Sequence, residues 1–282
     1  MPLTEEFCAD CTDFMVGIAK SAFRQSGGVK PEDVRLAGSG TLITVGGVRA
    51  ILTAAHVLSN LPADHIIGLI LPTRLDSKQL RPLLTIDMRT ARMISIAKGA
   101  DHSLGPDLGL LLLADFDWSR FPTGKTFFNL SKRREMMLNN PHEINRSVWG
   151  LCGTVDEWGQ LPAANDPSSH GTFHSIFMPT TVTGQRDDGE FDYFSVQAAD
   201  YLKSKLPKSF GGCSGGALWE GVVYERPDGS LEIRDKLLSG VAFYESGWED
   251  GRNTVTCHGR RSIYRNVMDE LSRLGQQRLD QE

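Results

Sequence analysis

The stretch GGCSGGALW, residues 211–219, places a thiol and a hydroxyl side by side between two pairs of glycines. Glycine tolerates positive φ angles and lets another molecule approach the backbone closely, so the run predicts a tight turn ahead of a strand. Such a turn can direct two successive N–H groups at one spot, as the binding of an oxyanion requires. Cys213 or Ser214 could therefore be a nucleophile, although the run could equally be an ordinary glycine-rich loop.

Two polar residues far upstream bear on this choice. His56 ends the apolar segment LTAAHV (52–57), and Asp107 directly precedes the apolar run in GPDLGLLLL (105–113). Taken alone, such a histidine is more often structural, and such an aspartate usually belongs to a turn. Together with Ser214 they give a histidine, an aspartate and a hydroxyl in that order, with the first two in one β-rich half of the chain and Ser214 in the other. A cleft between the halves could unite them in one site for nucleophilic catalysis.

The strand pattern predicts an all-β fold made of two antiparallel six-stranded barrels. We expect the first barrel over residues 31–130 and the second over 147–260, with a linker containing a short helix at 131–146. The segments with strand-like composition are 40–45, 48–57, 65–72, 83–88, 92–98 and 108–116 in the first half, and 147–153, 173–183, 191–197, 217–225 and 231–245 in the second.

Both ends of the chain show helical periodicity. Apolar residues from Phe7 to Phe23 recur at roughly helical spacing, which predicts a helix over residues 4–24 within an N-terminal extension over 1–30. Residues 261–275 carry one apolar face, so a C-terminal helix and tail are expected over 261–282.

Composition narrows the class of protein. The chain has 282 residues, of which 40% are hydrophobic and 23% charged, with a formal net charge of −5, as is typical of a soluble globular protein. An acidic balance argues against nucleic acid as the main partner, and no apolar run is long enough to cross a bilayer. Without a secretion signal, the five cysteines indicate free thiols, so we expect a cytoplasmic protein. Cys8 and Cys11 lack a second pair, and we expect no metal and no cofactor.

In these motifs the chain resembles the trypsin-like (chymotrypsin-fold) serine proteases. The resemblance rests on TAAH around His56, DLGLL around Asp107 and GCSGGAL around Ser214, and it extends over most of residues 36–275. It implies that Ser214 attacks a carbonyl carbon, that His56 is the general base and later the acid, and that Asp107 orients His56. It also implies an oxyanion hole formed by the N–H groups of Gly212 and Ser214.

The rivals for these roles are weaker. Asp101 and Asp115 flank Asp107 but do not directly precede the apolar run, and no TAAH-like strand precedes His102. Cysteine nucleophiles on this fold stand directly before the glycine pair, a position that Ser214 occupies here. Cys213 is expected to be a small buried side chain, with a redox switch beside the nucleophile as the alternative.

The resemblance also implies residues that would contact substrate. Lys208, six residues before the serine, would lie in the pocket for the side chain before the cleaved bond, where it could favour an acidic residue or remain solvated. Ala242 and Phe243 would offer backbone for strand-like pairing with a peptide, and Tyr244 would narrow the pocket entrance. The partner class implied is a protein or peptide substrate.

One departure from the family bears on regulation. Secreted members often carry an aspartate before the nucleophile that pairs with a newly cut N-terminus, whereas Cys213 stands at that position here. We therefore expect gating by a partner, a ligand or the N-terminal helix rather than by cleavage. The alternatives to an endopeptidase are a catalytically silent binding module, and an esterase or acyl transferase on the same scaffold.

Overall fold

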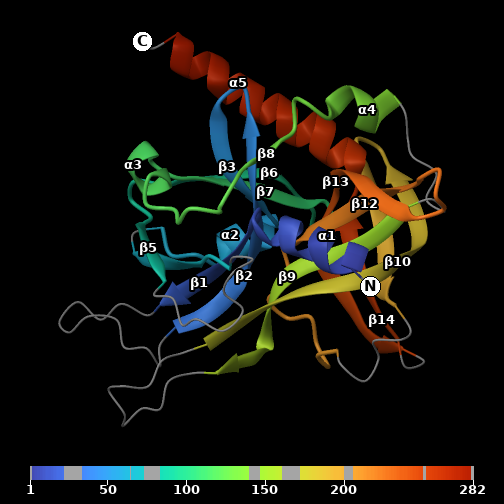
Figure 1. Cartoon of the computed structure of the whole chain (residues 1–282). Coiled ribbons are helices and arrows are strands. Elements are labelled where there is room, and N and C mark those ends of the chain that lie inside the picture. The colour runs from blue at the N-terminus through green and yellow to red at the C-terminus, as the bar shows by residue number, and fades with distance from the viewer. Residues whose placement is uncertain are drawn as a thin grey trace.

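The structure is a computed structural model that describes residues 2–21, 34–63, 65–72, 83–139, 147–160, 172–199, 206–249 and 252–280. Two antiparallel sheets dominate it and pack against each other, and a helical segment near the C-terminus runs across both (Figure 1). In the described part of the chain, no helix combines the length and the apolar composition that crossing a membrane would require.

The first sheet is an open half-barrel. Its strand order is β5-β4-β1-β2-β3-β7-β6, and the short strand β8 pairs with β2 in parallel. The two end strands, β5 and β6, do not pair with each other among the described residues, so the closed six-stranded barrel predicted for this half is not confirmed. Its strands are β1 (Met15–Ser21), β2 (Val34–Val45), β3 (Val48–Thr53), β4 (Ile66–Ile70), β5 (Leu84–Asp87), β6 (Arg92–Lys98), β7 (Asp107–Leu112) and β8 (Phe128–Asn129).

The second sheet closes into a six-stranded ring in the order β10-β11-β14-β13-β12-β9. Five of its strands coincide with segments expected from the sequence, and β14 was missed because it is rich in polar residues. The strands are β9 (Ser147–Gln160), β10 (Thr172–Asp188), β11 (Phe191–Ala198), β12 (Ala217–Glu225), β13 (Leu231–Glu249) and β14 (Arg252–His258).

Helices are short except near the two ends of the chain. The C-terminal helix was predicted from its apolar face, and it begins with a π-helical turn, η4 (Ser262–Val267), that continues into α5 (Met268–Leu279). The linker helix α4 (Arg134–Asn139) was also predicted, whereas residues 140–146 of that linker lie outside the described residues. The other helices are α1 (Pro2–Thr12), α2 (Ala55–Ser59) and α3 (Asp115–Trp118).

The helix predicted over residues 4–24 is observed only as far as Thr12, and the prediction is wrong over residues 15–21. Residues 15–21 form β1, which pairs with β2 on one side and β4 on the other. The strand is covered on both faces, since Met15, Val16 and Ile18 are all buried. A strand buried on both faces needs no alternation of polar and apolar residues. Its continuous apolar run therefore cannot be distinguished from the apolar face of a helix by periodicity alone. Residues 22–33 lie outside the described part.

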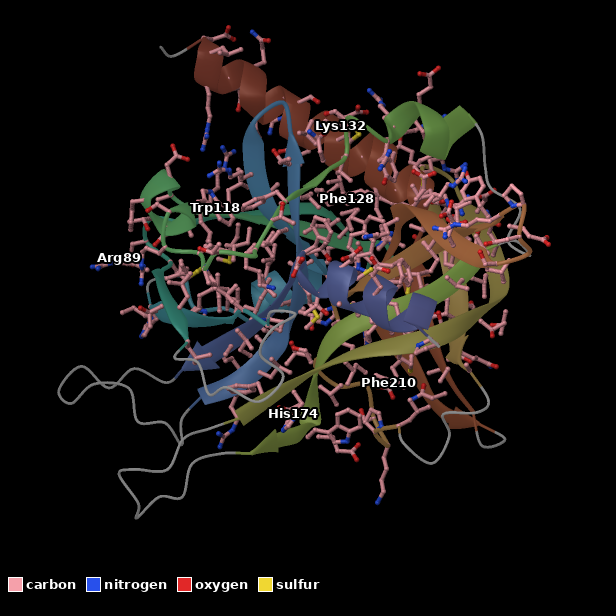
Figure 2. All side chains as sticks on the ribbon, viewed as in Figure 1. Arg89, Trp118, Phe128, Lys132, His174 and Phe210 are labelled. Atoms are coloured by element: carbon pink, nitrogen blue, oxygen red, sulfur yellow. The ribbon has the colours of Figure 1, made fainter. Side chains whose placement is uncertain are left out.

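A shared core joins the two sheets. Phe14 beside β1, Phe128 of β8 and Trp219 of β12 have ring centroids between 5.1 and 5.6 Å apart, and Phe128 lies near the centre of the molecule in Figure 2. Buried side chains of β3, β7, β13 and α5 complete the same cluster. The sheets are thus held as one body, so residues from both can be placed accurately against each other.

Candidate active site

His56 and Asp107 meet on the first sheet. His56 lies in α2, which begins two residues after β3 ends, and Asp107 is the first residue of β7, the strand next to β3. Gly109 of β7 lets α2 pack closely, because a Cβ there would lie 2.6 Å from Leu58 Cδ1. The helix therefore rests against β7 with His56 beside the aspartate.

The contact between these two residues has two parts. The His56 backbone N–H donates to Asp107 Oδ1 at 2.8 Å, and His56 Nδ1 is hydrogen bonded to Asp107 Oδ2. Each carboxylate oxygen thus has a separate partner on the same residue. With its Nδ1 proton held by Asp107, a neutral imidazole has the lone pair of Nε2 free to accept a proton.

Asp107 is ionised in this setting. Burial, which leaves 2% of its side chain exposed, favours the neutral acid, but the hydrogen bonds and positive charge offered by His56 outweigh that effect. The net result holds the pKa of Asp107 below its usual value of 3.8. A buried carboxylate whose charge is satisfied by one imidazole can stabilise that ring when it becomes protonated.

The run 211–216 forms a tight turn immediately before β12, as its sequence predicts. Gly212 and Gly215 have φ angles of +91° and +85°, which side chains with a Cβ rarely adopt. There is also no room for a side chain, because a Cβ on Gly212 would lie 2.1 Å from Leu36 Cδ2 and one on Gly215 would lie 2.1 Å from Thr53 Oγ1. The glycines are therefore required both by backbone conformation and by close packing on the first sheet.

Ser39 of β2 anchors this turn to the first sheet. Its backbone N–H donates to the carbonyl of Ser214 at 2.7 Å, and its hydroxyl donates to the carbonyl of Gly212 at 2.7 Å. The same hydroxyl accepts from the N–H of Thr154 at 2.8 Å, and the Ser39 carbonyl accepts from the hydroxyl of Thr53 at 2.7 Å. One fully buried residue thus links the turn to β2, β3 and β9.

Two N–H groups of the turn are left without a protein acceptor. Across the described residues, those of Cys213, Gly215 and Gly216 donate to carbonyls, whereas those of Gly212 and Ser214 donate to no protein group. Their directions are nevertheless fixed, because the N–H and C=O of a trans peptide point in opposite directions. The carbonyl of Gly211 accepts from Asp156 N–H at 2.9 Å, and that of Cys213 accepts from Gly216 N–H at 2.7 Å. Among the described residues, these two N–H groups therefore remain available to donate to a bound acceptor.

The structure places the Ser214 backbone beside α2 without a direct bond to His56. A Cβ on Gly38 would lie 2.6 Å from Val57 Cγ2 and 2.9 Å from the Ser214 carbonyl oxygen, so Gly38 separates the turn from the helix that carries His56. Among the described residues, no hydrogen bond joins the Ser214 hydroxyl to the His56 ring. In unliganded enzymes this bond is often long and tightens on substrate binding.

Cys213 points into the core beneath the turn. It is 2% exposed, and burial, reinforced by the charge of Glu245, raises the pKa of its thiol to about 12. A protonated, inaccessible thiol is neither a nucleophile nor a reactive redox switch. The buried interpretation of Cys213 therefore fits the structure better than the redox alternative.

The rival acids and histidine lie outside this arrangement. Asp101 is exposed and accepts hydrogen bonds from the backbone N–H and hydroxyl of Ser103. Asp115 is exposed at the start of α3, and His102 is exposed with its ring 5.8 Å from that of Tyr244. None of the three is hydrogen bonded to His56 in the described part of the molecule.

The four residues expected to contact substrate differ in exposure and in whether their backbone is free. Lys208 is exposed, and Tyr244 is half-buried. Ala242 does not offer a free backbone, because its carbonyl accepts from Gly215 N–H at 2.7 Å and its N–H donates to Gly216 at 2.8 Å. Phe243 is buried among aromatic side chains. Ala242 thus supports the turn from β13 rather than pairing with a peptide.

Three important residues were not singled out from the sequence: Ser39, Glu245 and His258. Glu245 of β13 accepts from the Phe210 N–H at 3.0 Å and from the Ser209 hydroxyl at 3.1 Å, which ties the segment before the turn to the second sheet. The buried ring of Phe210, labelled in Figure 2, anchors the same segment. Each acts through contacts distant in sequence, so no local pattern marks it.

The described residues contain no group of three or more histidine, cysteine or acidic side chains that could hold a metal ion.

Comparisons with known proteins add little. No family model and no curated protein matches the chain. Among solved structures it is similar to a chain described as "Aromatic interactions drive the coupled folding and binding of the intrinsically disordered Sesbania mosaic virus VPg protein", with 14% identity over 90% of each chain and a TM-score of 0.42. A likeness at that level carries no argument about this chain.

We predict that Ser39→Ala loosens the turn specifically. The change leaves the Thr154 N–H and the Gly212 carbonyl without a partner, which costs about 1–3 kcal/mol in free energy of unfolding. Amide exchange at Gly215 and Gly216 should accelerate. The matched control is Ser239→Ala, which removes another fully buried serine hydroxyl. That hydroxyl donates to Glu220 at 2.9 Å and does not contact the turn through a hydrogen bond among the described residues. Equal acceleration at Gly215 and Gly216 in both variants, measured by NMR, would contradict the assignment of Ser39.

A second prediction concerns pH and the buried His258. Burial of this ring lowers its pKa from 6.5 to about 4, against the opposing charge of Asp107. The groups facing it are Asp107, the Tyr193 and Phe243 rings and the Ser262 hydroxyl. Between pH 6.5 and 4 the unfolded chain binds a proton that the folded chain does not. The free energy of unfolding therefore falls as the pH drops, by on the order of 3 kcal/mol.

Denaturant titrations of wild type and His258→Gln over pH 4 to 7 measure this contribution. The stability advantage of wild type over the variant should shrink steadily as the pH falls through that window. An advantage that stays constant with pH would show that His258 is not buried in its neutral form.

Proposed function

We propose that the chain is a serine endopeptidase of the trypsin-like type, acting through His56, Asp107 and Ser214. The observation that carries the proposal is the pairing of His56 Nδ1 with the buried carboxylate of Asp107, next to a turn with two unpaired backbone donors. Two packed β-sheets, one closed and one a half-barrel, are compatible with the double-barrel fold of that family. The substrate class proposed is a protein or peptide.

The first half of the reaction would acylate the serine. Ser214 Oγ attacks the carbonyl carbon of the scissile bond while its proton passes to His56 Nε2, and the imidazolium so formed is stabilised by Asp107. The carbonyl oxygen becomes an oxyanion bound by the N–H groups of Gly212 and Ser214. Each such donor is worth about 2.7–4 kcal/mol in the transition state. His56 then gives its proton to the leaving amine, which leaves an acyl-enzyme.

The second half would hydrolyse the acyl-enzyme. A water molecule takes the place of the departed amine, and His56 Nε2 removes its proton as the oxygen attacks the ester carbon. The second tetrahedral intermediate uses the same two backbone donors. Its collapse returns the proton from His56 to Ser214 Oγ and releases the new carboxyl terminus.

Gating by a protein partner or a ligand remains part of the proposal. Cys213 occupies the position at which the cleavage-activated relatives carry an aspartate, and its buried neutral thiol cannot form an ion pair with an N-terminal amine. Deleting residues 1–30 would not test gating by the N-terminal helix, because the deletion also removes β1 from between β2 and β4.

A second candidate is a protease-fold binding module without catalysis. One observation favours it, namely that no hydrogen bond between the Ser214 hydroxyl and the His56 ring occurs among the described residues. The intact His56–Asp107 pair and the unpaired donors of the turn favour the enzyme instead, since a pure binding surface requires neither.

Labelling with a fluorophosphonate tests the proposal, because the probe reacts with an activated nucleophile and not with an ordinary hydroxyl. We expect labelling of wild type and of Cys213→Ala, no labelling of Ser214→Ala, and a loss of roughly three orders of magnitude or more in rate for His56→Ala. Ester and peptide substrates assayed in parallel distinguish an esterase from a peptidase.

The result that contradicts an enzyme is an absence of labelling in wild type both alone and with added candidate partners. Labelling that persists in Ser214→Ala but disappears in Cys213→Ala would instead assign the nucleophile to the thiol.

A further inference from the structure

A second histidine, His258 on the second sheet, contacts the backbone of Asp107. The backbone N–H of Asp107 donates to His258 Nε2 at 2.8 Å, and His258 is the last residue of β14. The residue before Asp107 is Pro106, which has no N–H to donate. Among the described residues, this hydrogen bond attaches the main chain of Asp107 to the second sheet at the point where β7 begins.

The ring of His258 is fixed in one tautomer. Because Nε2 accepts from Asp107, the ring proton lies on Nδ1, which faces the Ser262 hydroxyl at 3.3 Å. That hydroxyl lies 2.9 Å from Asp192 Oδ1 and donates onward to it. The Asp192 carboxylate also accepts from the backbone N–H groups of Ser262 at 2.8 Å and Arg261 at 3.0 Å. The chain of bonds runs from the start of η4 to Asp107.

Aromatic rings enclose His258 on the remaining sides. The ring centroids of Phe243, Tyr193 and Phe191 lie 4.9, 5.1 and 5.7 Å from that of His258, and the histidine is fully buried. Tyr193 and Phe243 also pack on Gly105, where a Cβ would lie 2.8 Å from the tyrosine ring. The surrounding rings and the hydrogen bonds at both ring nitrogens together keep the acceptor of His258 directed at Asp107.

We propose that His258 is a positioning residue for the reaction, holding the main chain at Asp107 so that the carboxylate faces His56. The inference rests on the proposed function. Both oxygens of Asp107 are used on His56, and their placement follows from the main chain at the first residue of β7. A small shift there would move Oδ2 away from Nδ1, and a misplacement of about 1 Å can cost 10²-fold in rate.

A pair of substitutions separates this role from a merely structural one. In His258→Leu the Asp107 N–H loses its acceptor, whereas in His258→Gln the side-chain amide oxygen can take the place of Nε2. We expect the rate of fluorophosphonate labelling, and kcat for a peptide or ester, to fall about tenfold or more in His258→Leu. KM should change little, and His258→Gln should stay within several-fold of wild type.

A second readout does not depend on catalysis. The proton shared by His56 Nδ1 and Asp107 Oδ2 should give a far-downfield NMR resonance in wild type and His258→Gln, and that resonance should shift or broaden in His258→Leu. If wild type is not labelled but the resonance responds in this way, the proposed function fails and the positioning role stands.

Two results would overturn the positioning role. The first is a folded His258→Leu variant that is labelled at the wild-type rate and whose His56–Asp107 proton resonance does not move. The other is a His258→Gln variant that melts like wild type but loses rate and resonance as His258→Leu does. If His258→Leu fails to fold, Ser262→Ala is measured in its place. This change removes the hydrogen-bond partner of His258 Nδ1 and should shift the His56–Asp107 proton resonance. An unmoved resonance in Ser262→Ala would overturn the positioning role of His258.

Discussion

The geometry of the candidate site depends on the four hydrogen bonds of Ser39. This buried side chain and its backbone bind the Gly212 and Ser214 carbonyls, the Thr154 N–H and the Thr53 hydroxyl. The first two bonds hold the turn that carries Ser214, and the last holds the end of β3, from which the chain continues to His56. Ser39, Thr53 and Thr154 are fully buried and the bond to the Gly212 carbonyl is part-buried. Losing any of these bonds would therefore leave a polar group with little or no access to water, which makes the junction between the sheets specific as well as tight.

From the opposite side, the second sheet fixes the remaining parts of the site. The backbone of Ala242 holds the turn, Glu245 holds the segment before it, and His258 holds the main chain of Asp107. The arrangement therefore exists only when both sheets have packed on their shared aromatic core. This explains why the three chemical groups can lie so far apart in sequence and still be placed accurately: each is attached to a strand end, and the strand ends meet at the junction.

Much of this organisation could be predicted from the sequence, and the failures have physical causes. Strands such as 92–98 and the turn at 211–216 were found because their signals are local. The strand at 15–21 was mistaken for helix because it is buried on both faces, which removes the alternation that marks a half-buried strand. Closure of the first sheet could not be predicted, since closure depends on the relative tilt of strands. Ser39 and His258 carry no local signal because the groups of the site that they hold, the Gly212 carbonyl and the Asp107 N–H, lie more than 100 residues away in the chain.

Binding of an oxyanion by the Gly212 and Ser214 N–H groups is the central proposed property of the turn. The most direct measurement is the backbone amide spectrum of the full chain with and without a peptidyl boronate, whose tetrahedral adduct with a serine hydroxyl carries an oxygen at the oxyanion position. We predict large downfield shifts of the Gly212 and Ser214 N–H protons, with much smaller changes at Gly215 and Gly216, whose N–H groups already donate to carbonyls. An adduct on Ser214 that leaves the Gly212 and Ser214 protons unmoved would contradict it.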